Sequence, residues 1–135
     1  TTGFLRSETW GHWACIAGRL PGDRTLGLNV SCGTNESGYR ENSFWLDGKR
    51  FALGGALFEF DQDEIESDWR IYGPEGDFEL TFSAGHGYHA NGASSNMSSD
   101  FHQLFGSFNG WIDIDSQRIE LKAQPGFTES QYMLW

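Results

Sequence analysis

The side chains best suited to chemistry are a small set of polar residues, most of them in the first third of the chain. A histidine, a carboxylate, amides and a hydroxyl occur there among apolar runs, with a tryptophan nearby and a second carboxylate near the C-terminus. These candidate ligand-binding residues are His12, Asn29, Ser31, Glu41, Asn42, Trp45 and Glu129. A carboxylate and a histidine in an aromatic-walled cavity can perform general acid–base catalysis on an apolar ligand. The same residues can instead form a hydrogen-bonded network that satisfies buried polar groups.

A hairpin is expected to position the first three of these residues. Leu20-Pro-Gly-Asp23 is a tight-turn sequence between two apolar runs. If Leu20 faces Asp23, the register places His12, Asn29 and Ser31 on one face of the sheet. Glu41 and Asn42 begin the next strand and are expected beside them. The opposite face is expected to be the core face, with Trp13, Cys15, Ala17, Leu26, Leu28, Val30 and Cys32.

The same register bears on the two cysteines. It places Cys15 opposite Leu28 and Cys32 opposite Gly11, so the thiols are about four residues, or ~13 Å, apart along the strands. That distance is too long for a disulfide. We therefore expect two reduced thiols, each at least half buried, in a cytoplasmic protein.

Length and charge limit the classes of function. The chain has 135 residues, and we expect a single domain over 1–135. Its formal net charge of −10 would repel nucleic acid and anionic membranes, both of which are polyanions. No apolar run approaches the ~20 residues that a membrane-spanning helix needs. We expect a soluble protein with neither a nucleic-acid partner nor membrane insertion.

The remaining sequence predicts further strands and no helix. Asp47-Gly48 is a strong hairpin dipeptide after a strand at 43–46, and Gly54-Gly55 interrupts a strand over 49–60. Strands at 69–72 and 78–82 flank a turn, and strands at 104–114 and 117–123 flank Asp115-Ser116, leaving a terminal segment over 124–135. The polar stretch 84–100 is expected to be the longest loop. About eight short strands predict an all-β antiparallel meander, forming a barrel or half-barrel, with a β-sandwich as the alternative.

Two other polar clusters contain residue types that can bind metals. His86 and His89 lie near His102 and Asp100, but glycines flank the histidines, and a zinc site needs three or four convergent ligands. The acidic run 61–68 lacks the ligand spacing of a calcium loop. We expect a polar loop and a solvated turn, with no metal and no cofactor.

Short motifs rich in aromatic residues follow one another along most of the chain. They are Trp10-x-x-Trp13, Leu28-Asn-x-Ser31, Glu41-Asn-x-x-Trp-x-Asp-Gly48, Phe58-Glu-Phe-Asp61, Trp69-Arg70, Phe105-Gly106, Gly126-x-Thr-Glu129 and Trp135. As a set they resemble the C-terminal half of the uncharacterised bacterial family called domain of unknown function 2804. That family is similar to lipocalin-like proteins with two barrel-like domains, including carotenoid hydratases. The resemblance implies a calycin-type β-barrel and no known reaction. Ser130-Gln131 departs from the family pattern, which leads us to expect an acidic residue and a histidine there.

Three functions remain open. The first is a lipocalin-like barrel that binds a hydrophobic small molecule, which we favour. The second is a hydratase- or isomerase-type enzyme that uses Glu41 and His12. The third is a structural half-barrel that serves assembly. Because the resemblance covers only half of a longer pattern, we also expect a homodimer, with contacts through an edge strand and the tail over 124–135.

Overall fold

The computed structural model describes residues 8–33, 42–93 and 98–134, and these residues form strands and turns with no helix that could span a membrane. The strands are β1 (Glu8–Leu20), β2 (Arg24–Gly33), β3 (Ser43–Leu46), β4 (Lys49–Ala52), β5 (Leu57–Glu59), β6 (Trp69–Tyr72), β7 (Phe78–Ala93), β8 (Ser98–Ile114) and β9 (Gln117–Leu134).

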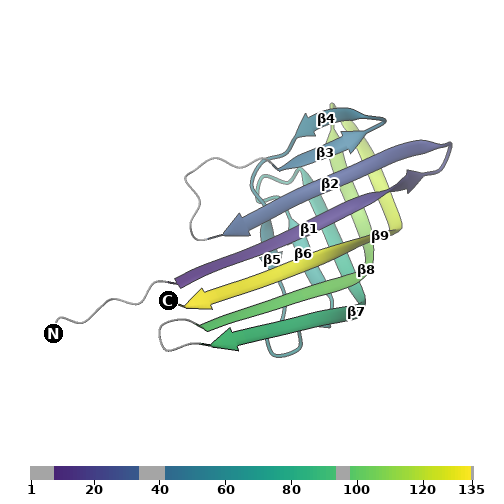
Figure 1. Cartoon of the computed structure of the whole chain (residues 1–135). Coiled ribbons are helices and arrows are strands. Elements are labelled where there is room, and N and C mark those ends of the chain that lie inside the picture. Colours follow the sequence, from purple (N-terminus) through teal and green to yellow (C-terminus); the bar gives the residue numbers. More distant parts are fainter. Residues whose placement is uncertain (1–7, 34–41, 94–97, 135) are drawn as a thin grey trace.

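All nine strands belong to one antiparallel sheet in the order β4-β3-β2-β1-β9-β8-β7-β6-β5. The sheet curls into a half-barrel (Figure 1). The first and last strands pair with each other in its middle, while the two edge strands, β4 and β5, are consecutive in the chain. The predicted antiparallel half-barrel is confirmed, and the β-sandwich alternative is wrong because the strands form one continuous sheet.

Several turns form where the sequence predicts them. Asp47 and Gly48 join β3 to β4 with φ angles of 53° and 83°, and Asp115 and Ser116 join β8 to β9 at 49° and 65°. Positive φ at both central residues gives the turn whose twist matches that of the flanking strands. The predicted interruption at Gly54-Gly55 is the break between β4 and β5.

The predicted register of the first hairpin is wrong by one residue. Leu20 pairs with Arg24, so Asp23 belongs to the turn, where Gly22 and Asp23 have φ angles of 84° and 62°. Cys15 consequently faces Asn29. A shift of one residue moves every side chain of one strand to the other face relative to its partner. Leu26, Leu28 and Val30 share the buried face with Ala14 and Ile16.

The long loop predicted at 84–100 is also wrong. β7 continues to Ala93 and β8 begins at Ser98, and the two strands pair along this length with a bulge between Ala84 and His86. Polar and glycine-rich composition is typical of loops. Within this stretch, a side chain at Gly87 would collide with that of Leu104 on the paired strand β8. Farther along β8 and β9, Gly106 and Gly126 allow the strands to bend, since a side chain at Gly106 would collide with the Ser83 carbonyl oxygen, and one at Gly126 with that of Cys15.

The long strands divide the sheet into two parts. In the barrel part, β2 to β6 and the adjoining stretches of β1, β7, β8 and β9 enclose a core that includes Phe44, Trp69, Phe82 and Phe108, each at most 1% exposed. In the part that we call the extension, the same four long strands continue beyond the barrel side by side, and the end of β2 accompanies β1 there as far as Gly33 (Figure 1). The extension comprises residues 8–13, 85–93, 98–103 and 129–134. None of its described residues belongs to the buried apolar core.

The C-terminal segment is part of the sheet. β9 extends to Leu134, which pairs with Glu8 of β1 and Ser98 of β8. The tail expected to form a dimer contact therefore has both of its edges paired within the chain. The homodimer itself remains a prediction.

Candidate functional site

The half-barrel divides the sequence-predicted site residues between its two faces. His12 lies on the inner face with Ala14 and Ile16, whereas Asn29 and Ser31 pair with Cys15 and Trp13 on the outer face. The expectation that His12, Asn29 and Ser31 share one face is wrong, and the cause is the register of the hairpin.

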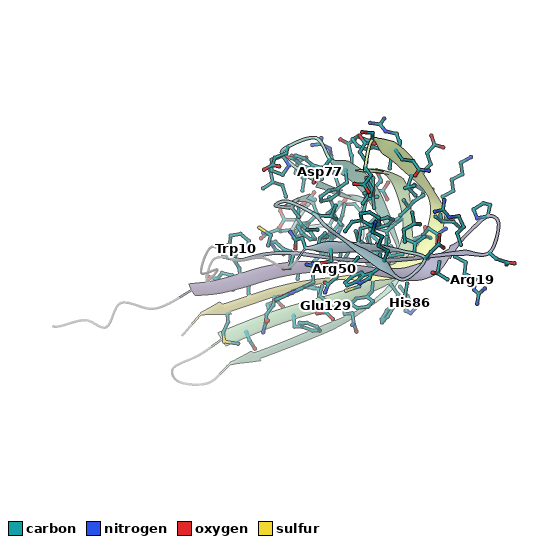
Figure 2. All side chains as sticks on the ribbon, turned by 90° about the horizontal axis from the view of Figure 1, so that it is seen from above. Trp10, Arg19, Arg50, Asp77, His86 and Glu129 are labelled. Carbon is teal, nitrogen blue, oxygen red and sulfur yellow. The ribbon has the colours of Figure 1, made fainter. Side chains whose placement is uncertain are left out.

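Glu129 and Trp45 also lie on the outer face. Glu129 faces Trp13 across the β1–β9 pair and accepts a hydrogen bond of 2.9 Å from Nε2 of Gln103. Trp45 pairs with Gly27. Figure 2 shows Glu129 on the sheet from above. Glu41 lies outside the described residues. The candidates that the structure describes therefore do not gather around one cavity.

Asn42 connects three segments of the half-barrel. Its side chain is 2% exposed, its Oδ1 accepts a hydrogen bond of 2.9 Å from the Ser31 amide, and its Nδ2 donates one of 2.9 Å to the Gly54 carbonyl. Gly54 in turn donates its amide to Asp77 Oδ2 at 3.4 Å. Asn42 thus satisfies backbone groups that the ladder leaves unpaired where β4 ends. This is the contribution expected of a structural network.

His12 lies within a group of aromatic rings. Its ring centroid is 5.2 Å from that of Trp10, 5.7 Å from Phe58, 5.0 Å from Phe60 and 6.5 Å from Trp69. Desolvation by these rings lowers the pKa of His12 from 6.5 to about 4. The imidazole is therefore neutral at pH 7, with one nitrogen that can donate and one that can accept a hydrogen bond.

His12 also lines a pocket of about 480 Å³ between the inner face of the extension and the loop after β5. We call it the open-end pocket. Three aromatic side chains, two histidines and four polar groups contribute to it. Its lining residues are Trp10, His12, Phe60, Gln62, Ile65, Asp100, His102, Ser130, Gln131 and Tyr132.

The strand register brings several of these groups together. Ser130 of β9 pairs with His12 of β1 on one side and with His102 of β8 on the other. Cross-strand neighbours on one face have Cβ atoms about 5 Å apart. Nε2 of His102 lies 3.2 Å from Oδ2 of Asp100. The pocket wall therefore combines a serine, two imidazoles and a carboxylate.

Two polar atoms on this inner face have no hydrogen-bond partner among the described residues. They are Nδ1 of His12 and Oγ1 of Thr128, both buried. Thr128 pairs with Ala14, one step along the face from the pair formed by Ser130 and His12. Buried polar groups in native proteins are nearly always hydrogen-bonded, so unpaired ones call for an explanation.

Sequence reasoning missed most of this pocket. Trp10, Phe60 and Tyr132 are not among the sequence-predicted candidates, Asp100 ends the predicted loop, and His102 lies between that loop and the next predicted strand. The alternation of Asp100 and His102 would have placed both on one face if that segment had been identified as a strand. No local signal indicates that Phe60 packs near them. No group of three His, Cys, Asp or Glu side chains suited to a metal occurs in the ranges that the structure describes.

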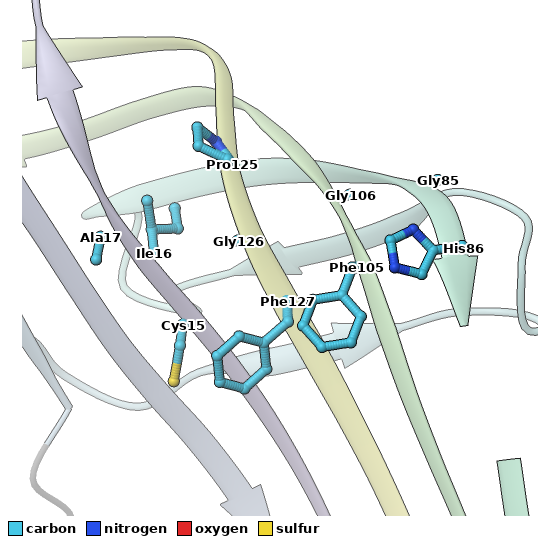
Figure 3. A pocket seen from close by; sticks show the side chains of 10 residues that line it. All are labelled: Cys15, Ile16, Ala17, Gly85, His86, Phe105, Gly106, Pro125, Gly126 and Phe127. Atoms are coloured by element: carbon cyan, nitrogen blue, oxygen red, sulfur yellow. The ribbon is translucent and has the colours of Figure 1, made fainter. Parts of the chain in front are cut away.

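A second hollow lies on the outer face and is mostly apolar. We call it the outer groove. It measures about 530 Å³ and includes Cys15, His86, Phe105 and Phe127, with Gly85, Gly106 and Gly126 at the bend of the strands (Figure 3). His86 stacks on Phe105 with centroids 5.2 Å apart. The outer groove offers apolar surface but few polar groups for orienting a ligand.

Comparison with known protein families decides the assignment. Residues 2–135 match the family described as "Domain of unknown function (DUF2804)". This chain belongs to the DUF2804 family. No curated protein and no solved structure matches the chain significantly. The description of the DUF2804 family names no activity, so a function for this DUF2804 domain has to be argued from its own geometry.

Proposed function

We propose that this DUF2804 domain binds a hydrophobic small molecule in the open-end pocket. One observation carries the proposal: the pocket places Trp10, Phe60 and Tyr132 around the neutral imidazole of His12. Ligand sites combine apolar and aromatic walls with a few polar groups that orient the ligand, and they commonly measure 300–1,000 Å³. The pocket volume of about 480 Å³ falls within this range.

The interior of the barrel part is a poorer candidate. Its inward-facing side chains are the packed core, with Phe44, Phe82 and Phe108 each 0% exposed. The ligand of this proposal therefore binds at the end of the half-barrel rather than along its axis. The hydratase alternative requires Glu41, which lies outside the described residues, and the proposal includes no reaction.

The neutral fluorescent probe N-phenyl-1-naphthylamine tests the proposal, because its emission increases in apolar sites. Wild-type protein should enhance the emission, and Ser130→Phe, which fills the pocket, should abolish the enhancement. Ser107→Phe makes the same change on the outer face and serves as the control. Loss of the signal in Phe105→Ala together with its retention in Ser130→Phe would assign binding to the outer groove and overturn the proposal.

A further inference from the structure

The inner face of the extension carries three successive rows of side chains across β1, β9 and β8. Residues paired across antiparallel strands lie side by side on one face, and alternate residues of a strand share that face. From the open end inward, the rows are Trp10–Tyr132–Asp100, His12–Ser130–His102 and Ala14–Thr128–Leu104. We call them the mouth row, the polar row and the deep row.

Burial increases from the mouth row to the deep row. Along β9, Tyr132 is 40% exposed, Ser130 is partly buried and Thr128 is 0% exposed. The other deep-row residues, Ala14 and Leu104, are also buried. All six residues of the mouth row and the polar row line the open-end pocket, and none of the deep row does. The polar row is therefore the floor of the pocket on this sheet, next to the buried core.

The wall opposite this sheet is apolar and is held in place. Phe60 and Ile65 contribute to it from the loop after β5. Trp69 stacks on Phe60 with centroids 4.0 Å apart and an angle of 9°, and its Nε1 donates a hydrogen bond of 2.8 Å to the Ile65 carbonyl. An apolar ligand body can therefore pack between this wall and the rings of Trp10 and Tyr132, in a site that is formed before the ligand binds.

The polar row requires hydrogen bonds from a ligand that covers it. Such a ligand removes water from Ser130 and His12, and a desolvated polar group without a partner costs about 1–3 kcal/mol. Nε2 of His102 already lies 3.2 Å from Asp100. By contrast, Nδ1 of His12 and, one row deeper, Oγ1 of Thr128 are buried without a hydrogen-bond partner among the described residues. A purely apolar ligand would leave the floor of the pocket poorly satisfied.

The groups of the polar row are best matched by a hydroxyl group. The Ser130 hydroxyl both donates and accepts hydrogen bonds, and the neutral imidazole of His12 has one donating and one accepting nitrogen. A ligand hydroxyl also donates and accepts, so it can pair with these groups in any arrangement of their hydrogens. A carbonyl or carboxylate can only accept.

We propose that the ligand of the open-end pocket is an apolar alcohol. Its hydroxyl group hydrogen-bonds with Ser130 and His12, and its apolar body packs between Phe60 and the rings of Trp10 and Tyr132. This inference rests on the proposed function, since it names the chemical class of ligand for the same pocket.

Three naphthalene probes of similar size test the inference by displacing N-phenyl-1-naphthylamine from the full chain. They are 2-naphthylmethanol, its hydrocarbon analogue 2-ethylnaphthalene, and 2-naphthoate, each added up to its solubility limit. The alcohol should bind about three- to tenfold more tightly than the hydrocarbon. In a site without hydrogen bonds the order would be reversed, because the hydroxyl group loses its water on binding.

The outcomes separate this inference from the proposed function. If 2-ethylnaphthalene displaces the dye as well as the alcohol does, the hydroxyl preference is overturned while the hydrophobic pocket stands. The same conclusion follows if 2-naphthoate displaces the dye best, since the ligand would then be a carboxylate. If the dye itself does not bind to folded wild-type protein, both proposals are overturned.

Substitutions in the polar row test the residues involved. Ser130→Ala should weaken binding of the alcohol about threefold and leave the hydrocarbon unaffected. His12→Phe keeps a ring but removes both nitrogens, so it should also lower the ratio of the alcohol affinity to the hydrocarbon affinity. Ser107→Ala, on the outer face, is the matched control and should change neither affinity. If the wild-type ratio persists in both Ser130→Ala and His12→Phe, the polar row does not recognise the hydroxyl group and the inference is wrong.

Discussion

The barrel part and the extension are built from the same strands but are stabilised differently. In the barrel part, inward-facing side chains such as Ile71, Leu80 and Ile112 are 0% exposed. In the extension, the corresponding inward positions carry Trp10, His12, Asp100 and His102, all of which remain partly accessible. Burial of apolar surface is the main source of stability, whereas surface left accessible remains available to a ligand. Most of the stability therefore comes from the barrel part, and the proposed binding belongs to the extension.

The largest expected effect on stability comes from removing one aromatic ring from the barrel part and one from the extension. Phe44→Ala should lower the free energy of unfolding by about 3–5 kcal/mol, because Phe44 is 0% exposed and its loss leaves a cavity. Tyr132→Ala should cost less than about 1 kcal/mol, because Tyr132 is 40% exposed. Urea unfolding of the two variants measures both values. Comparable losses would show that the extension contributes to stability as strongly as the barrel part does.

The hydrogen bonds of Asn42 provide a second test, at the boundary where β4 meets β5. Asn42→Ala leaves the Ser31 amide and the Gly54 carbonyl without their partner, and we expect a loss of about 2–3 kcal/mol. Asn109→Ala is the matched control, because Asn109 accepts one exposed hydrogen bond from the Ala123 amide. Its loss should cost about 1 kcal/mol or less. Similar values for the two variants would contradict the structural role of Asn42.

Two turns of the molecule show which parts of the fold the sequence could predict. The turn at Asp47-Gly48 depends on local backbone preferences, and its prediction is correct. The turn at 20–23 required knowing that Asp23 adopts a positive φ, which asparagine and aspartate tolerate but composition does not reveal. Because the predicted register counted Asp23 as a paired strand residue, it placed Asn29 and Ser31 on the wrong face of the sheet.

The open-end pocket was harder to predict than the fold because its residues come together only through the curvature of the sheet. Trp10, Phe60 and Tyr132 belong to distant segments, and the alternation within each strand does not specify which strands face each other. The glycines at 106 and 126, whose absent side chains permit the bend, were visible in the sequence but do not indicate its direction. The strand at 98–103 could not be predicted because its residues are polar. The extension buries no apolar core, so its strands lack the apolar pattern that identifies a strand.

The titration of His12, which lies in the extension, should make the stability of the domain depend on pH. Burial lowers its pKa from 6.5 to about 4, so between these values the unfolded chain binds a proton that the folded chain does not. Stability should therefore be greatest above pH 6.5 and fall as the pH decreases toward 4. The full shift corresponds to about 3 kcal/mol. Because His12 is only partly buried, we expect about 1–2 kcal/mol.

His12→Phe should remove this part of the pH dependence, as measured by urea unfolding at a series of pH values. His86→Phe, on the outer face, is the control for loss of a histidine. A wild-type slope that persists in His12→Phe would show that other groups cause the acid sensitivity.

The smallest expected effect concerns Cys15, on the outer face where the barrel part meets the extension. Burial raises the pKa of its thiol, and the Glu129 carboxylate raises it further. Because the thiolate is the reactive form, Cys15 should be alkylated slowly by iodoacetamide at pH 8. Glu129→Gln removes the carboxylate charge and should accelerate the reaction of Cys15 about two- to threefold.

Cys32 provides an internal reference for this measurement, because mass spectrometry can report the alkylation of each thiol separately. Cys32 pairs with His12 on the inner face, whereas Glu129 faces Trp13 on the outer face, so the rate of Cys32 should respond less to the charge of Glu129. Glu120→Gln, near the β8–β9 turn, controls for the change in net charge. An unchanged ratio of the Cys15 and Cys32 rates in Glu129→Gln would mean that solvent screens this carboxylate from the thiol. Burial alone would then account for the raised pKa of Cys15.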